Sequence, residues 1–91
     1  MLELKRTSKF KKDLKRAIKR KLPIDILDEV ILTLRKQEPL DPKYRDHKLT
    51  GNFEDFRECH LLPDWLLIYR VDEDKLTLTA ARTGSHSDLL E

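Results

Sequence analysis

Three histidines and two charged residues in the second half of the chain are of the types that acid–base chemistry requires. They are His47, His60, Asp64, Arg82 and His86. Histidine titrates near neutral pH, so one ring can take a proton from a ribose 2′-hydroxyl while another gives one to the departing 5′-oxygen. An arginine can hold the phosphate between them. If the fold brings these side chains to one edge of a sheet, they would suit cleavage of RNA without a metal.

Two simpler interpretations of the histidines stay open. Three histidines in 91 residues is only slightly above ordinary usage, and a histidine near a turn is usually solvated surface. A zinc site is less favoured, because no two of the histidines show the short paired spacing of a metal-binding helix or knuckle. The sequence therefore predicts neither a metal nor another cofactor.

The composition indicates one small domain that covers residues 1–91. A chain of this length holds a single core. Cys59 is the one cysteine in the sequence, which excludes an internal disulfide and fits a reducing compartment. The longest apolar runs are far too short to span a bilayer, and the charged segment after Met1 lacks the apolar core of a signal peptide. We expect a cytoplasmic protein with no membrane partner.

The charge is distributed unevenly along the chain. Residues 1–22 carry ten Lys and Arg against two acidic residues, whereas the remaining 69 residues carry nine basic and fifteen acidic groups. The N-terminal segment therefore predicts a cationic surface that meets a polyphosphate backbone or an acidic partner. Its candidate substrate-binding residues are Lys11, Lys12, Lys15 and Arg16. A solvated helix face is the alternative.

The first half of the chain predicts a strand followed by two helices. Residues 2–6 alternate as an edge strand does, and Thr7 or Ser8 can cap the helix that follows. A second helix begins near Pro23, and Pro39 prevents its continuation. Apolar residues repeat at helical spacing in both: Phe10, Leu14, Ala17 and Ile18, then Ile24, Leu27, Val30, Ile31 and Leu34. The two helices form a hairpin whose apolar faces require a sheet to cover.

The second half predicts a loop and three strands. The loop spans residues 38–50 and carries His47. A strand from Gly51 to about Cys59 follows, with a bulge indicated by the spacing of Phe53 and Phe56. After a turn at 62–64 come a nearly all-apolar central strand over 65–71, a last strand over 76–81 that delivers Arg82, and a tail or single helical turn. The order β-α-α-β-β-β predicts an α+β fold, with an antiparallel sheet of about four strands and the helix hairpin on one face.

Three segments of the sequence carry a specific resemblance. They are EPLDPKYRDHKLTG, FRECHLLPDWLLIY and RTGSHSDLL, and they contain D-H-x-L-x-G, H-x-x-P-D-W and R-T-G-S-H in that order. With the elements before them, they make nearly the whole chain resemble the RelE/YafQ superfamily of bacterial type II toxins, specifically its YafQ-like branch. The resemblance implies the RelE-like microbial RNase fold and a ribosome-associated mRNA endonuclease that inhibits translation. It also implies a cognate antitoxin that silences the toxin, and contact with DNA only through the antitoxin complex.

The resemblance also assigns site residues. His47 matches the histidine of the first motif, His60 and Asp64 match the histidine and aspartate of the second, and His86 ends the third; all four are implied to be catalytic. Arg82 matches the arginine of the third motif. We expect His86 to be the general acid and Asp64 or His60 to be the base, with His47 and Arg82 stabilising the charge on the phosphoryl oxygens.

Two positions, 65 and 90, correspond to places where an aromatic residue could contact RNA. Trp65 follows the implied catalytic aspartate, and it either stacks on a base or anchors the central strand. Related toxins often end in an aromatic residue near the site, where this chain has Leu90.

The alternatives to a ribosome-associated nuclease are a ribosome-independent ribonuclease and a non-catalytic RNA- or DNA-binding module on the same fold.

Overall fold

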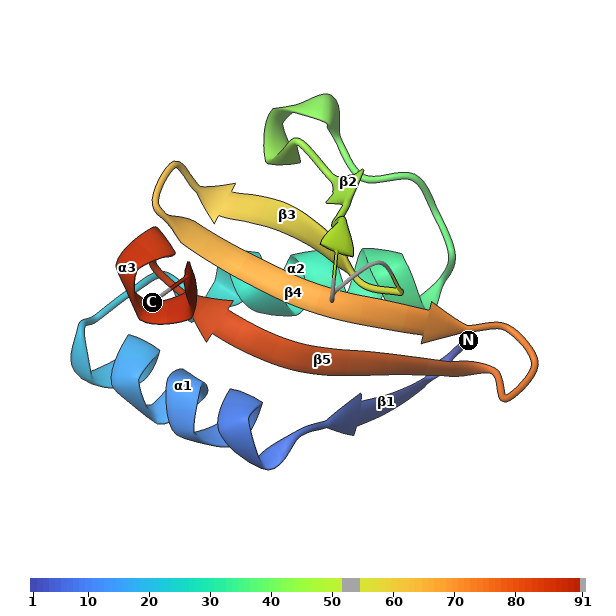
Figure 1. Cartoon of the computed structure of the whole chain (residues 1–91), viewed down its shortest axis with the longest axis horizontal. Coiled ribbons are helices and arrows are strands. Elements are labelled where there is room, and N and C mark those ends of the chain that lie inside the picture. Colours follow the sequence, from blue (N-terminus) through green and yellow to red (C-terminus); the bar gives the residue numbers. More distant parts are fainter. Residues whose placement is uncertain (52–54, 91) are drawn as a thin grey trace.

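The computed structural model describes residues 1–51 and 55–90, and in this part of the chain it forms one five-stranded sheet with three α-helices (Figure 1). The elements are β1 (Glu3–Arg6), α1 (Ser8–Lys19), α2 (Ile24–Arg35), a 3-10 turn (Pro42–Tyr44), β2 (His47–Lys48), β3 (Arg57–Leu62), β4 (Trp65–Asp72), β5 (Thr77–Gly84) and α3 (His86–Leu90). The predicted α+β class and the order of the long elements are confirmed.

The sheet has the strand order β1-β5-β4-β3-β2. The three long strands form the predicted antiparallel meander. The chain passes from β1 through both helices before the meander begins, and β1 pairs with β5 in parallel, so the sheet is mixed. The fifth strand, β2, was not predicted. It has two residues, and two residues in a polar loop carry no periodic signal.

The third strand begins later than the sequence indicated. β3 starts at Arg57, whereas Gly51 has a φ of +69° and belongs to the preceding connection. Phe53 of the predicted bulge lies outside the described residues. The irregularities that the structure shows lie elsewhere, between His60 and Leu62 on β3 and at Ile68 and Tyr69 on β4. The predicted central strand is confirmed as β4, which lies between β3 and β5.

Helix α1 covers the part of the β5 edge that β1 leaves open. Pairing between β1 and β5 ends at Ala80. Beyond it, Thr7 Oγ1 donates to the Ala81 carbonyl at 2.7 Å, and the Thr83 N–H donates to Asp13 Oδ2 at 3.2 Å. Thr7 also caps the helix, as predicted, by accepting from the Phe10 N–H at 3.0 Å. These contacts cover the end of β5, whose backbone groups would otherwise form an open edge.

One assignment on α1 was wrong. Ile18 was placed on the apolar face but is 55% exposed, whereas Asp13 is 4% exposed. The helix faces a strand edge with free N–H groups, so a carboxylate is the side chain that this position needs. Phe10 and Ala17 are buried as predicted.

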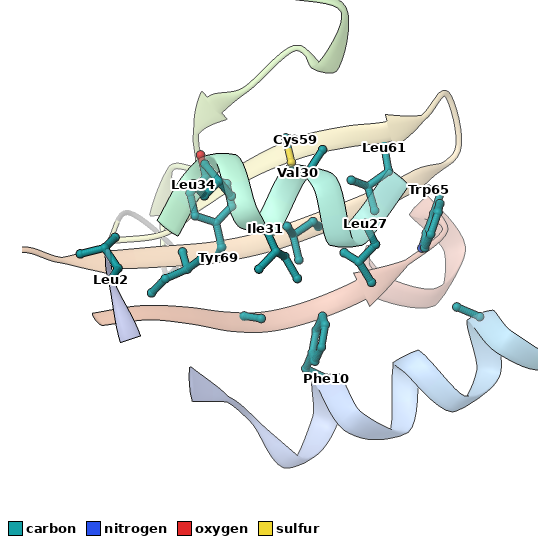
Figure 2. Packing of buried hydrophobic residues seen from close by; sticks show 14 residues of the cluster. Leu2, Phe10, Leu27, Val30, Ile31, Leu34, Cys59, Leu61, Trp65 and Tyr69 are labelled. Carbon is teal, nitrogen blue, oxygen red and sulfur yellow. The ribbon is translucent and has the colours of Figure 1, made fainter. Parts of the chain in front are cut away.

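The hydrophobic core lies between α2 and one face of the sheet (Figure 2). Leu27, Val30, Ile31 and Leu34 of α2 are buried there, as the sequence predicted, together with the large side chains of Trp65 and Tyr69. Phe10 and Ala17 bring α1 into the same core. No helix of the described residues is long and apolar enough to cross a membrane.

The opposite face of the sheet is left for the site. In a strand, successive side chains point to opposite faces, so Glu58 and His60 of β3 lie opposite the core residues Cys59 and Leu61. The register places Ile68 beside Glu58 and Arg82 beside Ile68. His60 of β3 and Arg82 of β5 therefore lie on the face away from the core, on either side of β4.

Candidate active site

The structure brings the three histidines together in a row, with His60 in the middle. His47 comes from β2, His60 from β3, and His86 from the first residue of α3. The ring centroids of His47 and His60 are 6.1 Å apart, and those of His60 and His86 are 5.7 Å apart. Segments that are distant in the sequence thus place three imidazoles within reach of one phosphodiester group.

Asp64 holds His86 from the turn between β3 and β4. Its Oδ1 accepts from the His86 backbone N–H at 2.9 Å and lies 2.6 Å from the ring Nδ1. These hydrogen bonds, the backbone one first, lower the pKa of Asp64 below its ordinary value. A carboxylate can only accept, so Nδ1 carries a proton and Nε2 is left for a substrate. Asp64 and His86 therefore form a dyad that fixes the orientation of the ring.

A backbone carbonyl fixes His47. The Arg45 carbonyl oxygen lies 2.9 Å from His47 Nδ1, so Nδ1 carries the proton here too. On the other side of the ring, His47 Nε2 lies 3.7 Å from Glu58 Oε1. Nε2 of His47 therefore remains the nitrogen that can exchange a proton or contact a phosphoryl oxygen.

The neighbour of His47, Asp46, is tied to the core. Its carboxylate accepts from Arg57 Nη2 at 3.0 Å and from the Tyr69 hydroxyl at 2.5 Å. Burial raises the pKa of Tyr69, and the adjacent Asp46 carboxylate raises it further, so the phenol stays a donor. This network fixes the short strand β2 against β3 and β4, and with it the position of His47.

His60 has the most perturbed surroundings of the three rings. Its Nδ1 is buried and has no hydrogen-bond partner among residues 1–51 and 55–90. Desolvation lowers the pKa of His60, and the charge of Arg45 lowers it further. A cavity of about 460 Å³ adjoins the ring and is also lined by Tyr44, Arg45 and Pro63. His60 is therefore a neutral ring at neutral pH, beside a space that could receive part of a nucleotide.

Arg82 is close to the site face, but it already has a partner. Its Nε donates to Asp13 Oδ2 at 2.7 Å and its Nη2 donates to Asp13 Oδ1 at 3.1 Å. The Arg82 side chain is 29% exposed and the Asp13 side chain 3%. This two-point ion pair joins β5 to α1, so a phosphate would have to compete with a buried carboxylate for the same guanidinium.

The four cations predicted on α1 differ in their surroundings. Lys11, Lys12, Lys15 and Arg16 are all exposed, as a diffuse cationic surface requires. Arg16 Nη1, however, also lies 3.3 Å from Asp88 Oδ1 of α3. Arg16 thus has a local partner in addition to the surface role that the sequence indicated.

The structure corrects the base-stacking role considered for Trp65. The residue is 2% exposed and belongs to the hydrophobic core, so its ring cannot stack on a base without leaving the core. The alternative that the sequence offered, an anchor for the central strand, fits this position. The side chain of Leu90 lies outside the described part of the structure.

Two site residues were missed in the sequence. Glu58 is 7% exposed and lies beside His47, and Arg45 is the residue whose carbonyl binds His47 and whose charge acts on His60. A signal for Glu58 existed, since it lies two residues before His60 in a strand and therefore on the same face. Arg45 gave none, because its left-handed backbone, with a φ of 48°, ends a 3-10 turn that has no periodicity.

Known proteins place this geometry in a family. Residues 2–91 match the family described as bacterial toxin of type II toxin–antitoxin system, YafQ. The mRNA interferase toxin YafQ of Escherichia coli K12 is 36% identical over 88 residues, which cover 96% of this chain and 94% of that protein. A metal-bound toxin from Helicobacter pylori is 46% identical, with a TM-score of 0.93 over 98% of this chain and 99% of the other. YafQ in the E. coli DinJ–YafQ complex is 33% identical, with a TM-score of 0.90 over the whole of both chains. The chain belongs to the YafQ family of bacterial toxins of type II toxin–antitoxin systems.

Proposed function

We propose that this toxin is an endoribonuclease that cleaves mRNA on the ribosome and so stops translation. The observation that carries the proposal is the row of three imidazoles, 6.1 and 5.7 Å apart, with Asp64 bonded to the last of them. The E. coli relative that carries the name mRNA interferase supports the class of enzyme. Sites of this kind supply proton transfers, and the ribosome supplies the bent mRNA on which they act.

In the proposed reaction the ribose 2′-hydroxyl is the nucleophile. His60 removes its proton, the 2′-oxygen attacks phosphorus, and the bond to the 5′-oxygen breaks as His86 Nε2 gives that oxygen a proton. The products are a 2′,3′-cyclic phosphate and a 5′-hydroxyl. His60 is the better base of the two that the sequence left open, because it is neutral and because Asp64 Oδ1 is already occupied by His86.

Charge on the phosphoryl oxygens needs donors near the row. His47 Nε2 is a donor when the ring carries a second proton, because the first is on Nδ1 and bonded to the Arg45 carbonyl. Arg45 itself is the second, because its side chain is exposed beside His60. In this assignment Arg82 holds β5 to α1 through Asp13, and it reaches the phosphate only if it exchanges that partner.

The proposed cleavage does not use a metal. The three rings are groups that transfer protons, and the described residues contain no group of three or more His, Cys, Asp or Glu side chains placed to hold a metal ion. The H. pylori relative was crystallised with a metal, so the test must include one. The rate of cleavage of isolated RNA, or the ratio of variant to wild-type rates, should be the same with and without a chelator.

The partners of the toxin follow from its family. YafQ of E. coli forms a complex with DinJ, and we propose that a small cognate antitoxin binds this chain in the cytoplasm and silences it. DNA would be contacted only through that complex. The exposed lysines of α1 would attract ribosomal RNA, the ribosome being the second partner.

One experiment tests the proposal as a whole. The chain is expressed in a bacterium with and without the gene beside its own, and growth and mRNA ends are followed. We expect growth arrest that the neighbouring gene relieves, with new ends that carry a 2′,3′-cyclic phosphate or 3′-phosphate and a 5′-hydroxyl. Ends with a 5′-phosphate would overturn the mechanism. Normal growth and intact mRNA would overturn the function, whereas equal cutting of purified RNA without ribosomes would favour the ribosome-independent alternative.

A further inference from the structure

The general acid proposed above sits on an element that cannot hold itself in place. Helix α3 has five residues, His86–Leu90. Helices this short are not stable in isolation, because nucleation is costly and few hydrogen bonds follow it. Its position must therefore come from contacts with the rest of the protein. One is the bond from His86 to Asp64 described above, and the other involves Asp88.

Asp88 joins α3 to the basic helix α1. Its Oδ2 accepts from Arg20 Nη1 at 2.7 Å, and its Oδ1 lies 3.3 Å from both Arg20 Nη2 and Arg16 Nη1. The Asp88 side chain is 13% exposed, whereas those of Arg16 and Arg20 are 48% and 47% exposed. The Arg20 and Ser85 hydrogen bonds keep the pKa of Asp88 far below its ordinary value. Asp88 is thus charged throughout the range in which an enzyme of this kind works.

The same carboxylate closes the start of α3. Asp88 Oδ2 accepts from the Ser85 N–H at 3.0 Å, and the Asp88 N–H donates back to Ser85 Oγ at 3.1 Å. Packing beneath it is tight, because a Cβ on Gly84 would lie 2.9 Å from Asp88 Cβ and 3.3 Å from Leu89 Cδ2. The end of β5 and α3 therefore fit together only with glycine at this position, and Asp88 lies at the point of contact.

We propose that Asp88 is a positioning residue of the cleavage site, which holds His86 in line with the other two rings by tying α3 to Arg16 and Arg20 of α1. The inference rests on the proposed function, and it gives the basic helix a second task. Arg20, which the sequence did not single out, and Arg16 then serve the chemistry through Asp88, while the lysines of α1 serve binding alone.

The first test replaces the charge and keeps the shape. Asp88→Asn retains an oxygen that can accept from Ser85 but loses the ion pairs, so we expect the single-turnover rate at saturating RNA to fall about 10- to 100-fold, as misplaced catalytic groups do. The KM should stay within about threefold of wild type, because no substrate contact is removed. Asp74→Asn, an exposed carboxylate beyond the far end of β4, is the matched control. Equal rates in the two variants would overturn the inference.

The second test weakens the same ion pairs from α1. Arg20→Gln should lower the rate by about 3- to 10-fold, because Arg16 still holds Asp88, and Lys36→Gln, an exposed lysine at the end of α2, is its control. In Asp88→Asn, where the ion pairs are already lost, adding Arg20→Gln should lower the rate little further. An equal loss in both backgrounds would contradict the proposed route from Arg20 through Asp88.

A third measurement does not depend on cleavage. Amide hydrogen exchange should be faster at Ser85 and Leu89, the amides bonded to Asp88 and to the Ser85 carbonyl, in Asp88→Asn than in wild type. Unchanged protection would show that α3 does not need Asp88. A wild-type chain that cuts no RNA would defeat the proposed function, and the exchange data would then decide alone whether Asp88 holds α3.

Discussion

The two histidines that flank His60 are held in different ways. His86 stands on a five-residue helix, and the groups that hold it are the side chains Asp64 and Asp88, the first of which is 69% exposed. His47 stands on a two-residue strand and is held by a backbone carbonyl, while the residue before it is bonded to buried Tyr69. One ring thus depends on charged side chains and the other on the backbone and the core. Substitutions on the His86 side should change rate, and those on the His47 side should change stability.

The largest effect is expected at the acid itself. His86→Ala should lower the single-turnover rate by roughly 10²–10⁴, because that ring gives its proton only in the transition state. RNA affinity should stay near wild type. The rate is measured at saturating substrate with affinity measured separately. Full activity of the variant would remove His86 from the mechanism even if the chain remained a toxin.

A smaller loss of cleavage rate is expected when His86 is kept and Asp64, the residue that orients it, is replaced. Asp64→Asn replaces the carboxylate that orients the His86 ring with a neutral amide, and partners of this kind are typically worth about 10- to 100-fold. The melting temperature should hardly move, since Asp64 is exposed on a turn. Thermal unfolding and single-turnover cleavage are compared on one preparation. A large drop in melting temperature with an unchanged rate would mean that the Asp64–His86 bond serves the fold.

The pH dependence of the rate should report on His60, the ring between His47 and His86. Desolvation and the charge of Arg45 lower the pKa of His60 below its ordinary value of 6.5, so the ring is still neutral just below pH 6.5. The low-pH limb of the rate profile, where the base becomes protonated, should therefore lie below about pH 6.5. Arg45→Gln removes a cation and should move this limb upward. A limb that lies above the ordinary value in wild type would exclude His60 as the base.

The lysines of α1 should affect binding and should leave the contacts that hold His47 and His86 unchanged. Neutralising Lys11, Lys12 and Lys15 together removes three charges from a diffuse field, so ribosome or RNA affinity should fall about tenfold and depend less on salt. The saturated rate should not change, because Arg16 and Arg20 still hold Asp88. Affinity is followed against salt concentration. A large loss of saturated rate would place these lysines in the active site.

The sequence predicted the strands around His86 better than the strand that carries His47. The meander was predictable because β4 is nearly all apolar, and it placed the Asp64 turn and His86 at the same end of the sheet. The parallel pairing of β1, the strand β2 and the burial of Asp13 were not. Each of these depends on a partner far along the chain, such as the bond between Asp13 and Arg82, 69 residues apart. Periodicity reports how one segment meets the core, and it contains no information about such partners.

The smallest effect on rate is expected on the His47 side, and it tests the comparison most sharply. Tyr69→Phe removes the hydroxyl that donates to Asp46, in a side chain that is 2% exposed. Arg57 still binds the carboxylate, so the free energy of unfolding should fall by about 1–2 kcal/mol, the usual consequence of losing one buried partner. His47 keeps its bond to the Arg45 carbonyl, so the saturated rate should remain within about threefold of wild type. Denaturant unfolding and single-turnover cleavage measure the two quantities. If Tyr69→Phe slowed cleavage as much as Asp64→Asn while stability stayed unchanged, the core would be orienting His47 for chemistry, and the two sides of the site would work in the same way.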